Sequence, residues 1–162
     1  MNASTLPTTA EDIGKRVLTL VTQIRGAEDI APARIEAITG IKVHFSDSDA
    51  KQYGFGAALS DEWVYNLVSL PGPNGDPDRL MFSFDDQTHN NADMAPVCAL
   101  DFDDYAKPLI EAGFSSKPSL GRHDQIEYWD FKRDDVLVQI YTRSESSAKA
   151  DHACVSMLIV NV

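Results

Sequence analysis

The sequence predicts an α+β fold in which one antiparallel sheet packs against two or three helices. Two observations lead to this prediction. Apolar residues recur at helical spacing within residues 8–40, and they then alternate singly, which is the period of a strand, over several short stretches. The connections between those stretches are too short for the crossovers that parallel strands require, so neighbouring strands are expected to run antiparallel.

Two helices are expected before the strands. Thr8 and Glu11 have the spacing of a capping box, and the apolar residues after them fall on one helical face before Gly26. A second, short helix is expected from Pro32, which suits a first turn, to Gly40, which suits a helix end.

A third helix is expected after the first set of strands. Asp101, Asp103 or Asp104 can cap its first turn, and Gly113 can end it. Pro108 falls inside this range and lacks a backbone N–H, so we expect a kink or a late start.

About seven strands are expected, in two sets separated by the third helix. The last of them is apolar at successive positions, which predicts a central strand that is covered on both faces. The two sets span residues 41–45, 53–59, 63–67 and 80–84, and then 126–131, 136–142 and 153–160.

The 162 residues fit one domain, 1–162, with residues 1–9 as a flexible Ser/Thr/Pro-containing segment. A short repeated sequence allows a second domain organisation. Ile-Glu-Ala occurs at 35–37 and again at 110–112, each time ahead of a glycine and a set of strands. A duplicated unit would then give halves at about 30–84 and 101–160.

The charge balance excludes several classes of partner. There are 14 Lys and Arg against 25 Asp and Glu, which gives a formal net charge of −11. Nucleic acids and anionic membrane surfaces are bound through Lys and Arg, so neither is an expected partner. The sequence has no apolar run long enough to span a bilayer. With 43% hydrophobic residues, a globular protein is expected, and it can be a monomer or a homodimer.

The location depends on the native N-terminus. The first residues lack the basic and apolar regions of a signal peptide. The protein is therefore expected in the cytoplasm if Met1 is native, and in the periplasm if an export leader has been removed.

Cys98 and Cys154 lie in apolar stretches and have two interpretations. In a reducing compartment they are expected to be buried small side chains, and in an oxidising one they can form a disulfide worth about 3–4 kcal/mol. His152 stands two residues before Cys154, but that spacing along a strand does not suit a nucleophile and its base.

An acidic stretch is the main anomaly of the sequence. No Lys or Arg occurs between Arg79 and Lys107, and three interpretations remain open. The carboxylates can belong to a solvated loop and a helix cap, or form a surface for a cationic partner, or bind Ca²⁺ without EF-hand spacing. The stretch contains Asp85, Asp86, Asp93, Asp101, Asp103 and Asp104, and the calcium set would be Asp85, Asp86, Asn90, Asn91 and Asp93.

No nucleophile-elbow, dinucleotide-binding or phosphate-loop motif occurs, and no cofactor is expected. The four histidines are scattered, so a transition-metal site would need residues far apart in the sequence to converge. Trp63 and Trp129, if exposed, would be natural anchors of a protein interface.

A small, strongly acidic α+β chain with an Asp-rich segment at Asp85-Asp86 through Asp103-Asp104 resembles bacterial immunity proteins, including those paired with effectors of type VI secretion systems. The resemblance covers the whole chain in composition and layout. It implies a non-enzymatic inhibitor that occludes a cationic toxin.

The expected function is therefore protein binding by an acidic surface. Two alternatives remain: an enzyme or small-ligand binder that uses a cavity between sheet and helices, and a calcium-stabilised envelope protein. The expected partner-binding residues are Asp85, Asp86, Asp93, Asp103, Asp104, Trp63 and Trp129.

Overall fold

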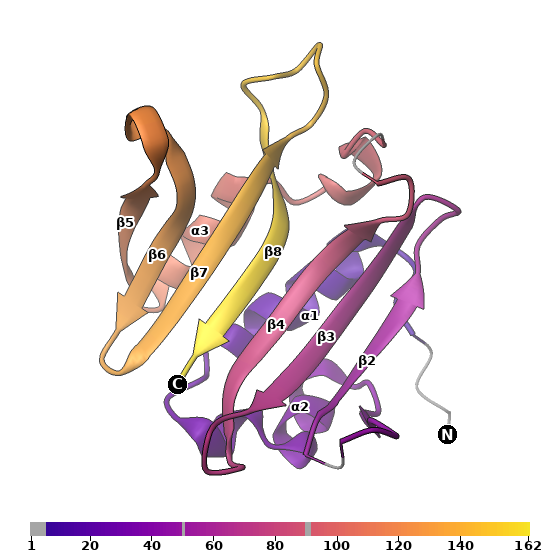
Figure 1. Cartoon of the computed structure of the whole chain (residues 1–162), viewed down its shortest axis with the longest axis vertical. Coiled ribbons are helices and arrows are strands. Elements are labelled where there is room, and N and C mark those ends of the chain that lie inside the picture. Colours follow the sequence, from indigo (N-terminus) through magenta and orange to yellow (C-terminus); the bar gives the residue numbers. More distant parts are fainter. Residues whose placement is uncertain (1–5, 50, 90–91) are drawn as a thin grey trace.

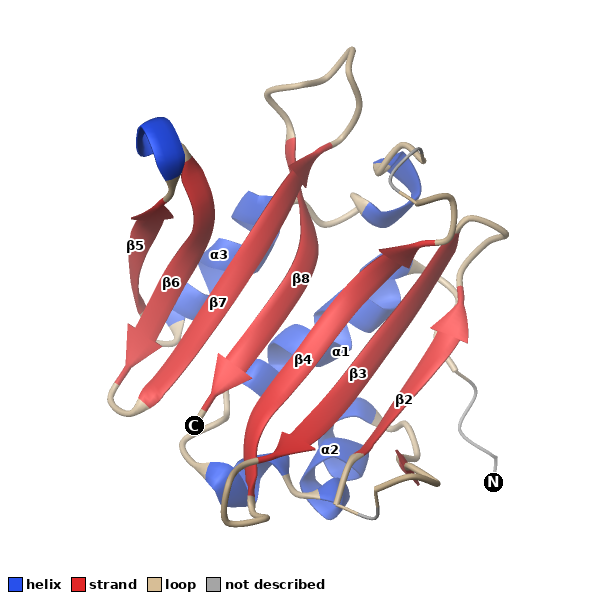
Figure 2. Ribbon diagram, in the orientation of Figure 1, coloured by secondary structure: helices blue, strands red, loops and turns tan. Residues whose placement is uncertain are grey.

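The computed structural model describes residues 6–49, 51–89 and 92–162, which form three α-helices and an eight-stranded antiparallel sheet (Figure 1). All three α-helices lie on one face of the sheet, and the opposite face is open (Figure 2). The predicted α+β class with an antiparallel sheet is confirmed, with eight strands in place of seven.

The helices begin close to their expected starts. α1 is capped by Thr9, whose hydroxyl accepts a hydrogen bond from the Asp12 N–H at 3.1 Å, so the expected cap at Thr8 and Glu11 was one residue too early. No helix in the described ranges is both long and apolar enough to cross a membrane. The α-helices are α1 (Ala10–Val21), α2 (Pro32–Thr39) and α3 (Phe102–Glu111), and the short 3-10 helices are η1 (Ala27–Ile30), η2 (Ala95–Val97) and η3 (Arg122–Asp124).

α3 starts at its predicted cap. The Asp101 carboxylate accepts a hydrogen bond from the Asp104 N–H, and the Asp104 carboxylate accepts one from the Asp101 N–H, both at 3.0 Å. This reciprocal pair fixes the first turn. The helix then runs through Pro108 to Glu111, so the proline does not delay its start.

The sheet consists of two four-stranded meanders whose last strands meet in the middle. Its order is β1-β2-β3-β4-β8-β7-β6-β5, and every neighbouring pair is antiparallel. Each meander follows its own helix or helices, which is the layout that a duplicated unit would have. The strands are β1 (His44–Phe45), β2 (Tyr53–Ala58), β3 (Trp63–Pro71), β4 (Pro77–Asp86), β5 (Ser115–Leu120), β6 (Ile126–Arg133), β7 (Val136–Ser144) and β8 (Ala153–Asn161).

The strand that the sequence did not predict is β5, with the sequence SSKPSL. It has no apolar alternation because it lies at the edge of the sheet and is largely exposed. Pro118 is tolerated there because an edge strand needs hydrogen-bond donors on one side only.

β8 lies between β4 and β7, so the predicted central position is correct. The prediction that both of its faces are covered is wrong. Leu158 and Val160 are buried under the helices, whereas Met157 and Ile159 lie on the open face and are only partly buried. The apolar residues on both faces of β8 therefore reflect its central position in the sheet, and no second layer covers its open face in the described residues.

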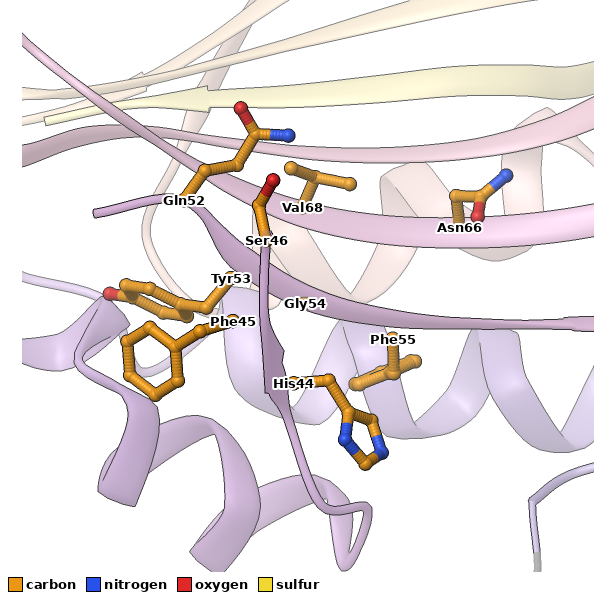
Figure 3. A pocket seen from close by; sticks show the side chains of 9 residues that line it. All are labelled: His44, Phe45, Ser46, Gln52, Tyr53, Gly54, Phe55, Asn66 and Val68. Atoms are coloured by element: carbon orange, nitrogen blue, oxygen red, sulfur yellow. The ribbon is translucent and has the colours of Figure 1, made fainter. Parts of the chain in front are cut away.

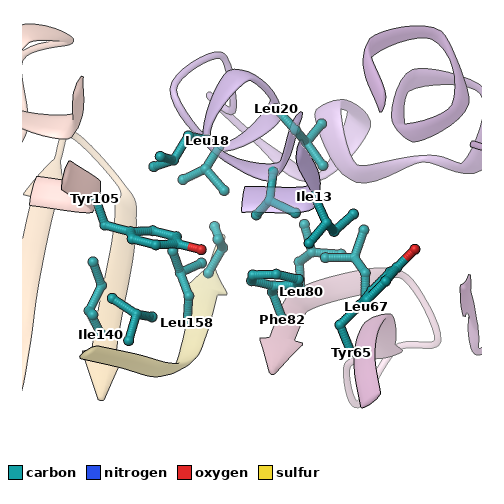
Figure 4. Close-up of a cluster of buried hydrophobic side chains, with 14 of the residues drawn as sticks. Ile13, Leu18, Leu20, Tyr65, Leu67, Leu80, Phe82, Tyr105, Ile140 and Leu158 are labelled. Carbon is teal, nitrogen blue, oxygen red and sulfur yellow. The ribbon is translucent and has the colours of Figure 1, made fainter. Parts of the chain in front are cut away.

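The space between helices and sheet is filled by apolar side chains (Figure 4). Ile13 and Leu20 of α1 and Tyr105 of α3 meet Phe82 and Leu158 of the sheet, and all five are buried. Burying a side chain of this size is worth about 1.5–3 kcal/mol. The result is a packed interior, and it leaves the loops at one end of the sheet as the place where polar groups gather.

Candidate functional site at the acidic end of the sheet

Three connections meet at one end of the sheet, at the top in Figure 1: the β2–β3 turn, the loop after β4, and the β7–β8 loop. Hydrogen bonds link them in series. The Gln87 N–H donates to the Glu62 carbonyl at 2.7 Å, and the Met94 N–H donates to the Glu145 carbonyl at 2.8 Å. We call residues 59–62, 85–89, 92–104 and 144–153 together the acidic end.

Asp85 and Asp86 point to opposite faces of β4, because successive strand residues alternate. Asp85 pairs with Val64 on the open face, where it accepts hydrogen bonds from Asn66 at 2.7 Å and Ser83 at 3.2 Å. Asp86 pairs with Trp63 on the helix face.

Of the calcium set, Asp85 and Asp86 leave β4 on opposite faces, so the strand does not present them as a pair. Asp93 is exposed in the loop beyond β4. Asn90 and Asn91, the other two expected ligands, lie outside the described residues.

Asp86 is a buried structural anion, which corrects its expected role in partner binding. Its side chain is 5% exposed and lies 3.1 Å from the Arg143 guanidinium. It also accepts hydrogen bonds from the Thr88 hydroxyl at 2.6 Å and the Ala92 N–H at 3.1 Å. Burial alone would raise the pKa of Asp86, but these hydrogen bonds together hold it well below its ordinary value of 3.8.

Neither tryptophan is an exposed anchor. Trp63 is 1% exposed, lies under the Arg143 guanidinium, and donates its indole N–H to the Asp93 carbonyl at 3.1 Å. Trp129 is half-buried against Phe102 of α3, with ring centroids 5.2 Å apart. Both side chains are used in packing, so the expectation that they anchor a partner is corrected.

His152 lies between two carboxylates. Its Nε2 is 2.9 Å from Asp101 and its Nδ1 is 2.7 Å from Glu145. The hydrogen bonds to Asp101 and Glu145 raise the pKa of His152, and the same contacts lower the pKa values of both carboxyl groups. The imidazolium form is favoured, and it ties the β7–β8 loop to the first turn of α3.

A disulfide joins Cys98 to Cys154 beside this histidine. It links the loop after η2 to the first residues of β8 across 56 residues of sequence, and both cysteines are buried. Of the two interpretations that the sequence allowed, the structure has the bonded one.

Four carboxylates of the acidic end are exposed, and we call them the rim: Asp61, Glu62, Asp93 and Asp103. None of them forms an ion pair with any residue in the described ranges. Asp104 is also exposed, but its carboxylate is engaged in the α3 cap. Asp61 and Glu62 were missed in the sequence because they lie in a turn whose polar residues have a sufficient local explanation.

Two open hollows lie inside the acidic end, one on each side of Arg143. The larger, of about 610 Å³, is lined by Trp63, Phe84, Asp86 and His89 among others, and the smaller, of about 470 Å³, lies over the β7–β8 loop. Arg143 borders both. The surface at this end is therefore indented as well as acidic.

A different pocket, of about 220 Å³, lies on the β1–β2 edge (Figure 3). His44, Phe45, Tyr53 and Phe55 supply its rings, and its lining contains no carboxylate, lysine or arginine. His44 and Tyr53 are the acid–base side chains in that lining.

Comparisons of the chain with protein-family models, curated proteins and solved structures find no match.

Proposed function

We propose that this protein is a non-enzymatic, immunity-like binding module, and that its acidic end occludes a cationic surface of a toxin or effector. One observation carries the proposal. The rim carboxylates come from two connections, the β2–β3 turn and the segment after β4, which hydrogen bonds bring to one end of the sheet; all four are exposed and none has an ion pair to a described residue, and Asp93 lines the smaller hollow.

The rim suits a cationic partner for electrostatic reasons. Four like charges at one end of the sheet attract Lys and Arg side chains and repel polyanions, which raises the association rate with a cationic partner at low salt. The effect weakens as salt rises, since the Debye length falls from about 10 Å at 0.1 M to about 3 Å at 1 M. The buried Asp86 carboxylate and the partly buried Arg143 guanidinium lie 3.1 Å apart and largely neutralise one another, so this pair contributes little to the field.

The packed interior favours this class over a small-ligand binder. The apolar side chains drawn in Figure 4 fill the layer between helices and sheet, where the alternative function would place its cavity. The hollows of the acidic end are open to solvent and suit projecting side chains of a protein.

The test uses the product of the gene encoded beside this one, because an immunity protein is normally encoded next to its toxin. Association rates are measured at 50 mM and 500 mM NaCl for the wild type and for D61N/E62Q/D93N/D103N. A second variant, D47N/D76N/E111Q/D135N, removes four exposed charges elsewhere and serves as the matched control.

We expect the rim variant to lose about tenfold or more in association rate at low salt, and the control variant to lose much less. Equal losses would mean that net charge matters and the rim does not. No binding by the wild type, or an unchanged rate in the rim variant, contradicts the proposal.

A further inference from the structure

The same end of the sheet brings together four side chains with the chemistry of a zinc site. Cys98, Cys154, His152 and Glu145 each present one ligand atom, and these four atoms lie within 4.8 Å of one another. Two sulfurs, one imidazole nitrogen and one carboxylate oxygen are a tetrahedral ligand set that Zn²⁺ accepts. Sequence spacing gave no sign of this site, because Cys98 is more than forty residues from the others.

We propose that, when the Cys98–Cys154 disulfide is reduced, the protein binds one Zn²⁺ through Cys98, Cys154, His152 and Glu145. The disulfide and the metal site are then two alternative cross-links between the same segments, which are η2, the β7–β8 loop and β8. An oxidising compartment favours the first cross-link, and a reducing compartment that supplies zinc favours the second.

The geometry needs only a small rearrangement. Around tetrahedral zinc, with bonds of about 2.0–2.3 Å, ligand atoms lie about 3.3–3.8 Å apart. The two sulfurs must separate to that distance, while His152 Nδ1 and Glu145 Oε1 must part from 2.7 Å to admit the ion. The remaining separations close by about 1 Å, within the reach of side-chain rotation.

The surroundings already support such a site. Zinc-bound histidines commonly donate their second ring N–H to a carboxylate, which fixes the ring. Asp101 lies 2.9 Å from His152 Nε2, leaving Nδ1 for the metal, and Asp101 is itself held by the α3 capping box. Lys149, 3.2 Å from the second oxygen of Glu145, offsets the negative charge that two thiolates and a carboxylate bring.

The redox step is a thiol–disulfide exchange. A dithiol reductant transfers two electrons and two protons to the Cys98–Cys154 bond, giving two thiols, and itself becomes a disulfide. Zinc then displaces the two thiol protons and the Nδ1 proton of the His152 imidazolium, and all three are released to solvent.

The experiment adds Co²⁺ or Zn²⁺ alone to the full-length chain after reduction with dithiothreitol and anaerobic removal of the reductant. Tetrahedral cobalt bound to thiolates gives charge-transfer and intense d–d absorption bands. We expect one equivalent of metal in the reduced protein, no such bands in the oxidised protein, and loss of the bands in C98A/C154A and H152A. H44A removes an exposed histidine on the β1–β2 edge and is the matched control, in which binding should be unchanged.

Asp101 is a positioning residue in this proposal, and D101N tests it. We expect the cobalt bands to persist while metal affinity falls by about 10–100-fold, the loss typical of such outer partners. A purely structural role for Asp101 would leave metal affinity unchanged.

Circular dichroism gives the decisive control for folding. A reduced chain that is folded but binds no metal, or binds it equally in C98A/C154A, overturns the proposal. If the reduced chain is unfolded alone, Zn²⁺ must restore its far-ultraviolet spectrum, and a chain that stays unfolded with zinc also overturns it.

Discussion

The acidic end contains two kinds of carboxylate with opposite roles. Asp86 is buried, ion-paired and surrounded by donors, whereas the rim residues Asp61, Glu62, Asp93 and Asp103 are exposed and have no ion pair within the described residues. The buried set holds the loops in place, and the rim is left available to a partner. A run of acidic residues is thus not one surface, because its members differ in burial and in the partners that the fold brings to them.

The largest loss of stability is expected when Trp63 is replaced, because its buried ring packs against Arg143, the partner of Asp86. Trp63→Ala should lower the free energy of unfolding by about 3–5 kcal/mol, the usual cost of removing a buried tryptophan. It also removes the indole donor to the Asp93 carbonyl. Chemical denaturation measures the loss, and W63F, which keeps most of the ring volume, should lose less than half as much. Equal losses in the two variants would mean that the side-chain volume is not what stabilises this end.

Removing the disulfide is expected to have the next largest effect. C98A/C154A should lose about 2–4 kcal/mol in oxidising buffer, because the cross-link restricts a long loop in the unfolded chain. Denaturation with and without reductant measures this. The wild type should show a similar loss when it is reduced without metal, whereas the variant should be insensitive to reductant.

Asp86 and its neighbour Asp85 allow a direct comparison of a buried, ion-paired carboxylate with one on the open face of the sheet. D86N should lower Tm by several degrees at pH 7, because it replaces the buried carboxylate that pairs with the partly buried Arg143 guanidinium by a neutral amide. D85N should have a small effect, since its partners Asn66 and Ser83 are neutral and can bond an amide. A larger loss in D85N than in D86N would reverse the assignment of roles.

The same pair gives a prediction for acid. The folded pKa of Asp86 lies below its ordinary value, so its stabilisation is present above pH 3.8 and is lost as pH falls through the folded pKa. The difference in Tm between wild type and D86N should therefore be largest near neutral pH and should shrink below pH 3.8. Thermal melts at pH 7 and pH 2.5 test this, and a difference that grows in acid would contradict it.

The smallest effect on stability is expected at the rim. D61N/E62Q/D93N/D103N should change the free energy of unfolding by no more than about 0.5 kcal/mol, because exposed side chains without ion pairs contribute little. Denaturant titration measures this. A loss of more than 1 kcal/mol would show that these carboxylates also hold the loops, and the contrast with Asp86 would fail.

Local signals predicted much of the fold. Pro32, Gly40 and the Asp101 cap act within one helical turn, and strand alternation depends on neighbouring residues, so both can be read from sequence. β5 could not be, because an exposed edge strand needs no apolar face. The open face of β8 was also missed, since burial depends on which side the helices pack, and that is set by contacts between distant elements.

The candidate site was less predictable than the fold. The acidic stretch located Asp93 and Asp103 correctly on the surface, but the partners that remove Asp86 and Asp101 from it come from Arg143 and His152, some fifty residues away. These two pairs of side chains come together only because β4, β7 and β8 are neighbours in the sheet, and no spacing in the sequence predicts them. His152 lies just before β8 and Cys154 is the second residue of that strand, so these two are the members of the cluster that lie nearest one another in the sequence.

The pairing of β4 with β8 also has a consequence for how the sheet is completed. During synthesis β4 emerges about 75 residues ahead of the strand that will cover its inner edge, with α3 and β5 to β7 made in between. For that interval the first meander is a sheet with an open edge, lined by Leu80, Phe82 and Phe84 on its apolar face. An unpaired strand of this kind is a template for association with other nascent chains. The edge of β4 that ends up in the middle of the sheet is therefore the edge most open to wrong pairing during synthesis.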